Sequence, residues 1–449
     1  MSDYDVIVIG SGPGGGHCAG QLADAGLRVA IVERELLGGE CDYWACMPSK
    51  TLLRPGEALQ GAREAPGAAE AVNGLVRPEP AFAWRDFMVS SYDDAGKLGW
   101  YQGKGIDVLR GSGRIEGPGR VSVNGEEHSA RDIVISTGSS PFIPPIEGLR
   151  ELDGVWTNRE ATGLTEVPRR MLVLGGGPVG VEMAQVVARM GGEVALVEGA
   201  ERVLPREPEP LGRALGEAMA TDGVELCFGQ HTSAVRRDGQ DFVLEFPERE
   251  ELRGDRLLVA TGRRPRVEGI GLENVGIDPG PRGIEVDATM RAGEGIWAIG
   301  DVTGIWPLTY VAKYQGRVAA ANIAGGKRDA NYDAVPRVVF TDPQAAAVGV
   351  ADGSHSVTVP LAEVPRTYTY LREYANKAYF MTLVSDGERV TGAYALGPDA
   401  GEWLQQATLA IRARVPLDVI DDVIQPFPTF SEVFLHALLE LRARAPAAA

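Results

Sequence analysis

The sequence predicts an α/β fold with two doubly wound units of the Rossmann type, followed by an α+β domain. Two observations predict the units: the pattern GxGxxG occurs twice, and each copy follows a short apolar run and precedes a stretch of small residues. The third observation is a change near residue 336, beyond which segments such as 378–384 read as antiparallel strands. The last part of the chain therefore forms a domain of a different kind.

The first unit begins with the run 5–9, apolar and β-branched after Asp5, which fits a buried parallel strand. Its second strand, 28–32, ends at Glu33. The glycines between the strands let the backbone approach a pyrophosphate, and the following helix N-terminus favours negative charge. These glycines are Gly10, Gly12, Gly14 and Gly15. Glu33 can accept hydrogen bonds from an adenosine ribose, so the unit predicts a dinucleotide site.

The same unit recurs between strands 171–174 and 193–197, and it ends at Glu198. Its turn contains Gly175, Gly177 and Gly180. Two further runs, 133–138 and 257–262, each read as a strand followed by Thr-Gly, and we expect each to close its own sheet. They add Thr137, Gly138 and Gly262 to the expected cofactor-binding residues. Two such units imply two dinucleotides, which suits a flavin dinucleotide together with a nicotinamide dinucleotide.

These repeats and the Pro- and Gly-rich crossovers between them predict the domain boundaries. We expect residues 1–152 and 278–335 to form an FAD-binding domain. Residues 153–277 should form an NAD-binding domain, and residues 336–449 the C-terminal domain.

Composition limits the partners and the compartment. The 449 residues carry a formal net charge of −18, which argues against binding to nucleic acid or to anionic membranes. The N-terminus is acidic rather than signal-like, and no apolar run approaches the roughly 18–20 residues that span a bilayer. With only four cysteines, a cytoplasmic location is expected, and we expect no metal site.

Four residues separate Cys41 from Cys46, just after the first dinucleotide unit. Two thiols placed in this way can interconvert with a disulfide while two electrons pass. We expect a helical turn to place both sulfur atoms on one face. The positive charge of Lys50 would stabilise an anionic reduced flavin and a thiolate.

At this point the chain resembles the pyridine nucleotide–disulfide oxidoreductases, the group of lipoamide dehydrogenase, glutathione reductase and mercuric reductase. The resemblance covers essentially the whole chain. The motifs that carry it are both GxGxxG turns, the run GGxCxxxxCxPSK at 38–50, Glu182, Ile299-Gly300-Asp301, Phe340-Thr341-Asp342-Pro343 and Pro428-Thr429-Phe430-Ser431-Glu432.

The resemblance implies a role for each matching residue. Cys46 would be the thiolate in charge transfer with the flavin, and Cys41 the interchange thiol that faces the substrate. Lys50 would lie near the reactive nitrogen of the flavin and pair with Glu182, while Asp301 would bind the ribityl chain. The C-terminal domain would be a dimerisation domain, and the homodimer would share its active sites between subunits.

One position departs from the family pattern. The family carries a histidine before the last Pro-Thr, held by the glutamate that follows, and this histidine moves the proton of the interchange thiol. Here Phe427 occupies that place, although Glu432 is present. Phenylalanine cannot titrate. A phenylalanine at this position also resembles the 2-ketopropyl coenzyme M oxidoreductase/carboxylase branch of the family, but that branch alters the glutamate as well. Asp42 and Tyr43 are the candidate substitutes for the missing histidine.

Glu198 favours NADH, because a carboxylate suits a ribose diol and repels a 2′-phosphate. Arg202 and Arg206 follow closely and keep NADPH possible.

The leading hypothesis is an FAD-dependent enzyme that passes electrons from NADH through a Cys41–Cys46 disulfide to a small electrophilic acceptor, of the disulfide or thioether type. Three alternatives stay open: direct transfer from flavin to a quinone or another acceptor, a 2-ketothioether-cleaving reductase/carboxylase, and a non-catalytic FAD redox sensor.

Overall fold

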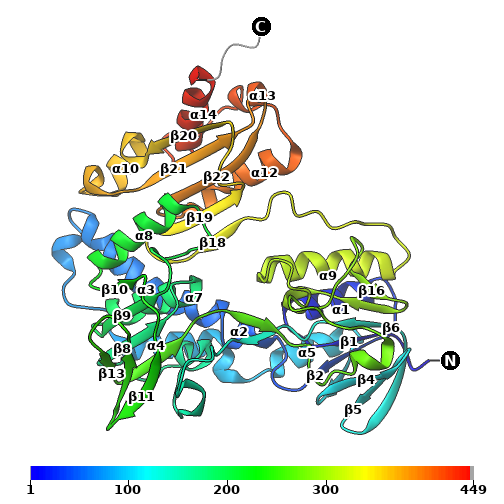
Figure 1. The fold of residues 1–449 in the computed structure, drawn as a ribbon. Helices are drawn as coiled ribbons and strands as arrows, with labels where there is room; N and C mark the ends of the chain where they lie inside the picture. The colour runs from blue at the N-terminus through cyan, green and yellow to red at the C-terminus, as the bar shows by residue number, and fades with distance from the viewer. Residues whose placement is uncertain (1, 445–449) are drawn as a thin grey trace. The chain divides into compact units, whose positions relative to one another are not determined.

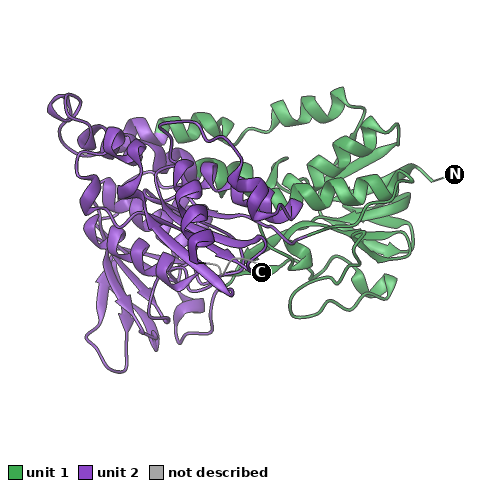
Figure 2. Ribbon diagram, turned by 90° about the horizontal axis from the view of Figure 1, so that it is seen from above, with its two compact units in different colours: residues 1–48, 83–142, 262–331 green, residues 49–82, 143–261, 332–449 purple. Residues whose placement is uncertain are grey.

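The structure is a computed structural model that describes residues 2–444 (Figure 1). The chain divides into two compact units, distinguished by colour in Figure 2. Unit 1 contains residues 2–48, 83–142 and 262–331, and unit 2 contains residues 49–82, 143–261 and 332–444. Two of the five boundaries, at 48/49 and 82/83, fall inside helices, α3 (Cys46–Glu64) and α4 (Pro78–Met88). The expected division into FAD-binding, NAD-binding and C-terminal domains stays a prediction.

Unit 1 is built on an eight-stranded sheet in which the main strand order is β16-β17-β6-β1-β2-β3. The parallel register pairs Ile7 of β1 with Ala30 of β2 on one side and with Ile133 of β6 on the other. The strands of unit 1 are β1 (Tyr4–Ile9), β2 (Val29–Glu33), β3 (Asp107–Arg110), β4 (Gly113–Gly117), β5 (Arg120–Val123), β6 (Glu126–Ile135), β7 (Ser139–Pro141), β15 (Arg263–Pro265), β16 (Arg291–Gly293) and β17 (Ile296–Ala298). Its other helices are α1 (Pro13–Asp24), α2 (Gly39–Tyr43), α5 (Ala95–Gly103) and α9 (Thr309–Ile323).

Helices α1 and α9 lie side by side in unit 1 (Figure 1). Gly14 and Gly316 allow this close approach. A Cβ on Gly14 would lie 3.2 Å from Ala312 Cβ, and a Cβ on Gly316 would lie 2.8 Å from Gly14 O. Gly14, which the sequence assigns to the cofactor turn, therefore also has a packing role that brings the start of α9 towards the first glycine turn.

The first part of unit 2 repeats the plan of unit 1 on a four-stranded sheet of order β10-β9-β8-β14. Leu172 of β8 pairs with Ala195 of β9 and with Leu257 of β14, all in parallel. The strands and helices are α6 (Asn158–Thr162), β8 (Arg170–Leu174), α7 (Pro178–Arg189), β9 (Glu193–Glu198), α8 (Glu209–Thr221), β10 (Glu225–Phe228), β11 (Ala234–Asp238), β12 (Asp241–Glu245), β13 (Leu252–Gly254) and β14 (Arg256–Val259). The two strand-Thr-Gly runs thus become β6 and β14. Strand β14 closes its sheet as the edge strand, whereas β6 lies between β1 and β17 inside the sheet of unit 1, so the expectation holds only for the second run.

The remainder of unit 2 is an antiparallel sheet of order β18-β19-β22-β21-β20, with α14 packed on β20 and β21 (Figure 1). Its elements are β18 (Arg337–Val339), β19 (Gln344–Gly349), β20 (His355–Pro360), α10 (Pro365–Tyr370), β21 (Phe380–Ser385), β22 (Val390–Gly397), α11 (Ala400–Trp403), α12 (Gln405–Ala413), α13 (Leu417–Asp421) and α14 (Glu432–Arg444). The predicted fold class, two doubly wound units and a C-terminal α+β domain, is confirmed.

Candidate active site

The first glycine turn has the backbone geometry that a pyrophosphate requires. Gly10 has φ +101°, and a Cβ at this position would lie 2.8 Å from the Ser136 carbonyl carbon. A Cβ on Gly15 would overlap the carbonyl oxygen of Gly10, so only glycine lets α1 begin this close to β1. A Cβ on Gly12 meets no described atom within 4 Å. The space in front of the α1 N-terminus is therefore open, and the described residues place no side-chain cap there.

Glu33 is held at the edge of this turn by hydrogen bonds to both carboxylate oxygens. Oε2 accepts the Ser11 N–H (3.0 Å) and the Ser11 hydroxyl (2.7 Å), and Oε1 accepts the Glu35 N–H (2.9 Å). A carboxylate fixed in this way keeps acceptor capacity for a ribose diol, because each oxygen has two lone pairs. The donor set of the turn thus fits the adenosine and pyrophosphate parts of FAD.

The second turn repeats this arrangement. Gly175 has φ +108° and lies against the Ala260 backbone, Gly180 lies against the Gly175 carbonyl, and Gly177 faces open space. Glu198 accepts the Gly176 N–H at Oε2 (2.7 Å) and the Ala200 N–H at Oε1 (2.9 Å). This second turn fits a second dinucleotide by the same criteria.

The loops that follow β6 and β14 lie together in unit 1 through paired strands β7 and β15. Gly138 and Gly262 both take positive φ, +73° and +128°, and the Thr137 hydroxyl donates to the Arg266 carbonyl (2.7 Å). The Ser139 hydroxyl donates to Asp301 Oδ2 (2.6 Å) and accepts from Arg263 Nε (2.7 Å). Asp301 is therefore oriented by a serine and an arginine that the sequence did not single out.

The two thiols are brought together by a break between two helices. Cys41 lies in α2, Cys46 is the first residue of α3, and Trp44 ends α2 with φ −135°. The expected helical turn is wrong. Residues five apart in a continuous helix point roughly 140° apart, so an unbroken helix would separate the sulfur atoms. The positive φ of Gly38 (+116°) and Gly39 (+64°) starts α2 as a separate short turn.

Thr309, at the start of α9, contacts both sulfur atoms. Its hydroxyl donates to Cys41 Sγ (3.3 Å) and lies 3.2 Å from Cys46 Sγ. The hydrogen bond to Cys46, burial and the negative charge on Cys46 together raise the pKa of Cys41, whereas the Thr309 hydrogen bond lowers it. The hydrogen bond and charge of the neighbouring sulfur thus oppose loss of the Cys41 proton, and Thr309 partly offsets them.

Lys50 and Glu182 form an ion pair in unit 2. Lys50 Nζ lies 2.8 Å from Glu182 Oε2 and 3.1 Å from Oε1, and the glutamate side chain is only 6% exposed. The Phe340 N–H also donates to Glu182 Oε1 (3.0 Å), and Lys50 Nζ lies 4.8 Å from the centroid of the Phe340 ring. The pair expected from the sequence is present and is further held by the backbone of residue 340.

The C-terminal motif is exposed at Phe427, and its glutamate bonds to the local backbone. Phe427 is 73% exposed in the isolated chain, and Ile424 is 95% exposed. Glu432 Oε2 accepts the N–H of Thr429 (3.0 Å), so its carboxylate caps the backbone before α14. The glutamate that would orient a histidine therefore has a local structural partner.

The candidate proton donors beside Cys41 have other partners. The Asp42 carboxylate lies 2.7 Å from Lys97 Nζ. The Tyr43 hydroxyl donates to the Leu37 carbonyl (3.1 Å), and burial raises the pKa of Tyr43 to about 12. These contacts weaken both as substitutes for the missing histidine.

Sequence reasoning missed Thr309 and the arginines on Glu40. Glu40 precedes Cys41 and lies 3.1 Å from Arg266 Nη2 and 3.7 Å from Arg263 Nη2. No spacing rule links residues more than two hundred positions apart; the only available signal was that Thr309 precedes an apolar helical stretch.

No helix within residues 2–444 combines the length and the apolar composition needed to cross a bilayer. No group of three or more His, Cys, Asp or Glu side chains in this part of the chain could hold a metal ion.

Comparison with known proteins identifies the relatives of this architecture. Residues 4–316 match the family described as pyridine nucleotide-disulphide oxidoreductase, and residues 335–438 match its dimerisation domain. The chain is 35% identical to a dihydrolipoyl dehydrogenase of Thermus scotoductus, covering 99% of both chains. It is also 35% identical to a mercuric reductase of Shigella flexneri, covering 95% of this chain and 79% of that protein. The HOCl-induced flavoprotein disulfide reductase RclA from Escherichia coli superposes with a TM-score of 0.84 at 26% identity, covering 99% of this chain and 100% of RclA.

Proposed function

Because the chain belongs to the pyridine nucleotide–disulphide oxidoreductase family, we propose that it passes electrons from NADH through FAD and the Cys41–Cys46 pair to a small electrophilic acceptor. The observation that carries the proposal is the pair of adjacent thiols bridged by Thr309. The family membership makes the chain a flavoprotein disulfide oxidoreductase, and the proposal concerns its electron path and its acceptor.

The first turn, Glu33 and Asp301 would hold FAD, and the second turn with Glu198 would hold the nicotinamide dinucleotide. When bound, FAD accepts a hydride from NADH and supplies two electrons to a disulfide. Lys50 provides a positive charge, oriented by Glu182, that stabilises negative charge near the flavin and the thiolate.

The two thiols would then act in different steps of the reaction. Reduction of the disulfide would break the S–S bond and leave one thiol and one thiolate. The family resemblance assigns the thiolate to Cys46, and the raised pKa of Cys41 is consistent with a proton on Cys41. To attack an acceptor disulfide, Cys41 must lose that proton, form a mixed disulfide and release one thiolate; Cys46 then attacks Cys41 Sγ, restores the internal disulfide and releases the second thiolate. Overall, NADH and a proton convert the acceptor disulfide into two thiols and leave NAD⁺.

Phe427 supports a restricted class of acceptors. A phenyl ring supplies no proton to the leaving group, and the raised pKa of Cys41 lowers its thiolate fraction at neutral pH. Acceptors whose leaving thiols are already acidic, and thioether-type electrophiles that react without a proton from the enzyme, fit this site best. Dihydrolipoamide-type exchange, which needs an acid–base group, fits it poorly.

The raised pKa of Cys41 also favours a second candidate, in which electrons leave FAD directly for a quinone and the thiols do not turn over. The 2-ketothioether-cleaving carboxylase and the redox sensor remain alternatives without a structural observation of their own.

For the nicotinamide dinucleotide, we favour NADH over NADPH. Glu198 places a negative charge at the end of β9, where a 2′-phosphate would lie. Arg202 donates through Nη2 to the carbonyls of Pro205 and Glu207 (both 3.0 Å), so this guanidinium is committed to its own loop. Arg206 is exposed and keeps NADPH use open.

The dimerisation domain implies a homodimer. We further propose that the two subunits share their active sites, since Phe427 and Ile424 are exposed in the isolated chain and can be covered by a partner. Sedimentation that finds an active monomer at assay concentration would contradict shared sites. A cytoplasmic location stays a prediction.

A steady-state acceptor panel tests the proposal. The panel contains lipoamide, glutathione disulfide, an aromatic disulfide with an acidic leaving thiol, a quinone and Hg²⁺, each assayed with wild type and Cys41→Ser. The proposal predicts the fastest turnover with the aromatic disulfide and its loss in the variant. Equal turnover of the quinone by both proteins, with little disulfide reduction, would select direct transfer from FAD.

A further inference from the structure

Helix α7 directs three polar side chains, two of them buried and one partly buried, at one short segment of chain, residues 340–343, which leads into β19. The side chains are Glu182, Gln185 and Arg189. Their spacing of three and four residues places them in a row along one face of the helix. All three bond to the backbone or the side chain of this segment.

The hydrogen bonds to Phe340 and Asp342 follow the order of the side chains along α7. The Phe340 N–H donates to Glu182 Oε1 (3.0 Å). The Asp342 N–H donates to Gln185 Oε1, and Gln185 Nε2 donates back to the Asp342 carbonyl, each at 2.8 Å. Arg189 donates to the same carbonyl from Nη2 (2.8 Å) and to Asp342 Oδ2 from Nη1 (2.7 Å). Both polar groups of the Asp342 backbone are therefore fixed by α7.

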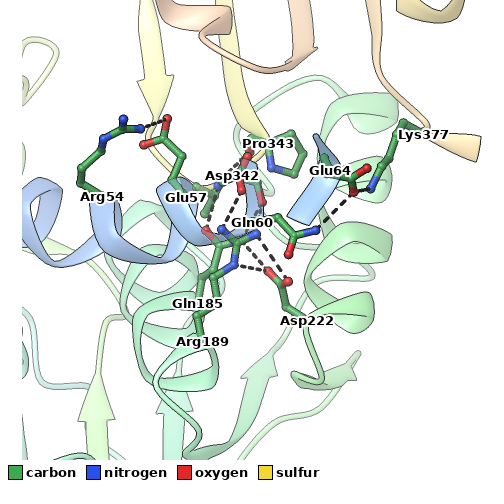
Figure 3. Close-up of polar contacts among 11 residues, drawn as sticks. Arg54, Glu57, Gln60, Glu64, Gln185, Arg189, Asp222, Asp342, Pro343 and Lys377 are labelled. Carbon is green, nitrogen blue, oxygen red and sulfur yellow. Dashed lines mark hydrogen bonds and ion pairs between the residues drawn. The ribbon is translucent and has the colours of Figure 1, made fainter. Parts of the chain in front are cut away.

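Arg189 is itself fixed at the far end of the row. Asp222, at the end of α8, lies 3.1 Å from Arg189 Nε and 2.7 Å from Gln185 Nε2. Figure 3 shows Arg189 between the carboxylates of Asp222 and Asp342, with Gln185 directed into the same cluster. A Cβ on Gly56 of α3 would lie 2.9 Å from Arg189 Cδ, so α3 closes over the arginine. The guanidinium side chain is only 13% exposed.

The near end of the row is the Lys50–Glu182 pair. The same Glu182 carboxylate accepts from Lys50 Nζ and from the Phe340 N–H. A glutamate side chain has three rotatable bonds, so a second fixed donor limits the orientations from which it can meet the lysine. The position of residue 340 therefore bears directly on the geometry of the ion pair.

We infer that Gln185, Arg189 and Asp342, here called the α7 clamp, are positioning residues: they hold the 340–343 segment and, through Phe340, keep Glu182 in the orientation that receives Lys50. The inference rests on the proposed function for the importance of the Lys50–Glu182 pair. The clamp contacts neither Lys50 nor a dinucleotide turn in the described structure, so its effect on the reaction passes through Glu182.

The experiment measures how readily Lys50 reacts with an amine-acylating reagent in the FAD-loaded protein, by mass spectrometry of the Lys50 peptide. The variants are Gln185→Leu, which removes the central bonds, and Arg189→Lys, which keeps the charge but loses the forked geometry. Glu182→Gln sets the upper limit for release of Lys50. Glu64→Gln is the matched control, because Glu64 also lies on α3 and pairs with a different lysine, Lys377 (2.6 Å).

The clamp predicts that Gln185→Leu and Arg189→Lys raise the labelling rate of Lys50 about fivefold, the factor expected for one lost hydrogen bond, while Lys377 labelling stays unchanged. Glu64→Gln should do the reverse. General loosening would raise both lysines together in every variant. Unchanged Lys50 labelling in both clamp variants, or equal increases at Lys50 and Lys377, would overturn the inference whatever the activity.

Stopped-flow reduction of the bound FAD by NADH separates this inference from the proposed function. If Lys50 labelling rises and flavin reduction slows by a similar factor, with the apparent affinity for NADH unchanged, both stand. If Lys50 labelling rises while flavin reduction is unaffected, the clamp stands and the proposed role of the Lys50–Glu182 pair is wrong.

Discussion

The segment that carries the cysteines and the segment around Phe427 differ in how many of the groups needed for disulfide reduction they contain. The first has two adjacent thiols, a threonine bound to both sulfur atoms and, farther along α3, a lysine paired with a buried glutamate. The second has an exposed phenyl ring in place of a titratable group, and its glutamate caps a backbone amide.

This difference teaches that delivery of electrons and supply of protons are separable functions of the molecule. Everything needed to reduce the Cys41–Cys46 pair can reside in the first segment and the dinucleotide turns. What the pair can reduce in its turn depends on whether a proton is available at Cys41. In the proposed function, the residue at position 427 would therefore restrict the class of acceptor.

The largest expected effect comes from replacing either cysteine in the first segment. Cys46→Ser should lower disulfide-dependent turnover roughly 10³-fold or more and abolish the long-wavelength absorbance band of the reduced enzyme, because its thiolate is lost. Cys41→Ser should lose turnover equally but keep or strengthen the band, since Cys46 is then permanently a thiol. Absorbance spectra under anaerobic reduction give the result. Identical spectra for wild type and both variants would show that neither thiol contacts the flavin.

The next largest effect comes from returning a titratable group to position 427 in the second segment. Phe427→His should raise reduction of lipoamide and glutathione disulfide by ~10-fold or more, because a positioned acid–base group contributes about 10²–10⁴-fold. Phe427→Leu is the apolar control and should show no gain. Because the pKa of Cys41 is raised, its thiolate fraction grows as pH rises, so wild-type turnover should increase towards alkaline pH. The histidine variant should reach its plateau at lower pH.

Rapid wild-type reduction of both disulfides, with no gain in Phe427→His, would contradict this prediction. In that case another group already moves the proton, and Asp42 and Tyr43 would be the next residues to replace.

The preference for NADH over NADPH tests the role assigned to Glu198 in delivering electrons. Wild type should use NADH with a kcat/KM at least about tenfold above that for NADPH, because a 2′-phosphate close to Glu198 costs on the order of 1–3 kcal/mol. Glu198→Gln should narrow the ratio while keeping the shape of the side chain. Steady-state assays with one fixed acceptor measure both ratios. A wild-type ratio near one would assign control of the site to Arg206.

The smallest expected effect comes from removing the Thr309 hydroxyl that contacts both sulfur atoms. The Thr309 hydrogen bond lowers the pKa of Cys41, so Thr309→Val should raise that pKa further and move the pH profile to higher pH. Loss of about 1 kcal/mol corresponds to roughly fivefold less thiolate at a given pH. Thr309→Ser keeps the hydroxyl and should behave like wild type. The pH dependence of iodoacetamide alkylation at Cys41 measures the shift, and coincident profiles for all three proteins would show that the hydroxyl has no such role.

The comparison also marks what could be predicted from the sequence. Both dinucleotide units were readable because strand, glycine turn, helix and terminal acid lie within about thirty residues, as at 5–33 and 171–198. The Lys50–Glu182 pair came only from the family resemblance. Thr309 and the α7 clamp were missed, since Asp342 meets Gln185 across more than 150 positions of chain.

The break between α2 and α3 was missed for a different reason. A spacing of five residues does not keep two side chains on one helical face, because side chains that share a face are three or four residues apart. Two consecutive glycines with positive φ, at 38 and 39, were the available signal that the first cysteine belongs to a separate turn.

We propose that the Cys41–Cys46 pair and FAD store electrons in series, and anaerobic titration with NADH decides the claim. Wild type should take up about two equivalents of NADH per FAD, one for the disulfide and one for the flavin, with the long-wavelength band appearing after the first equivalent. Cys41→Ser should take up about one equivalent. Uptake of about one equivalent by wild type, with no long-wavelength band at any point, would contradict the claim and leave the thiols outside the electron path.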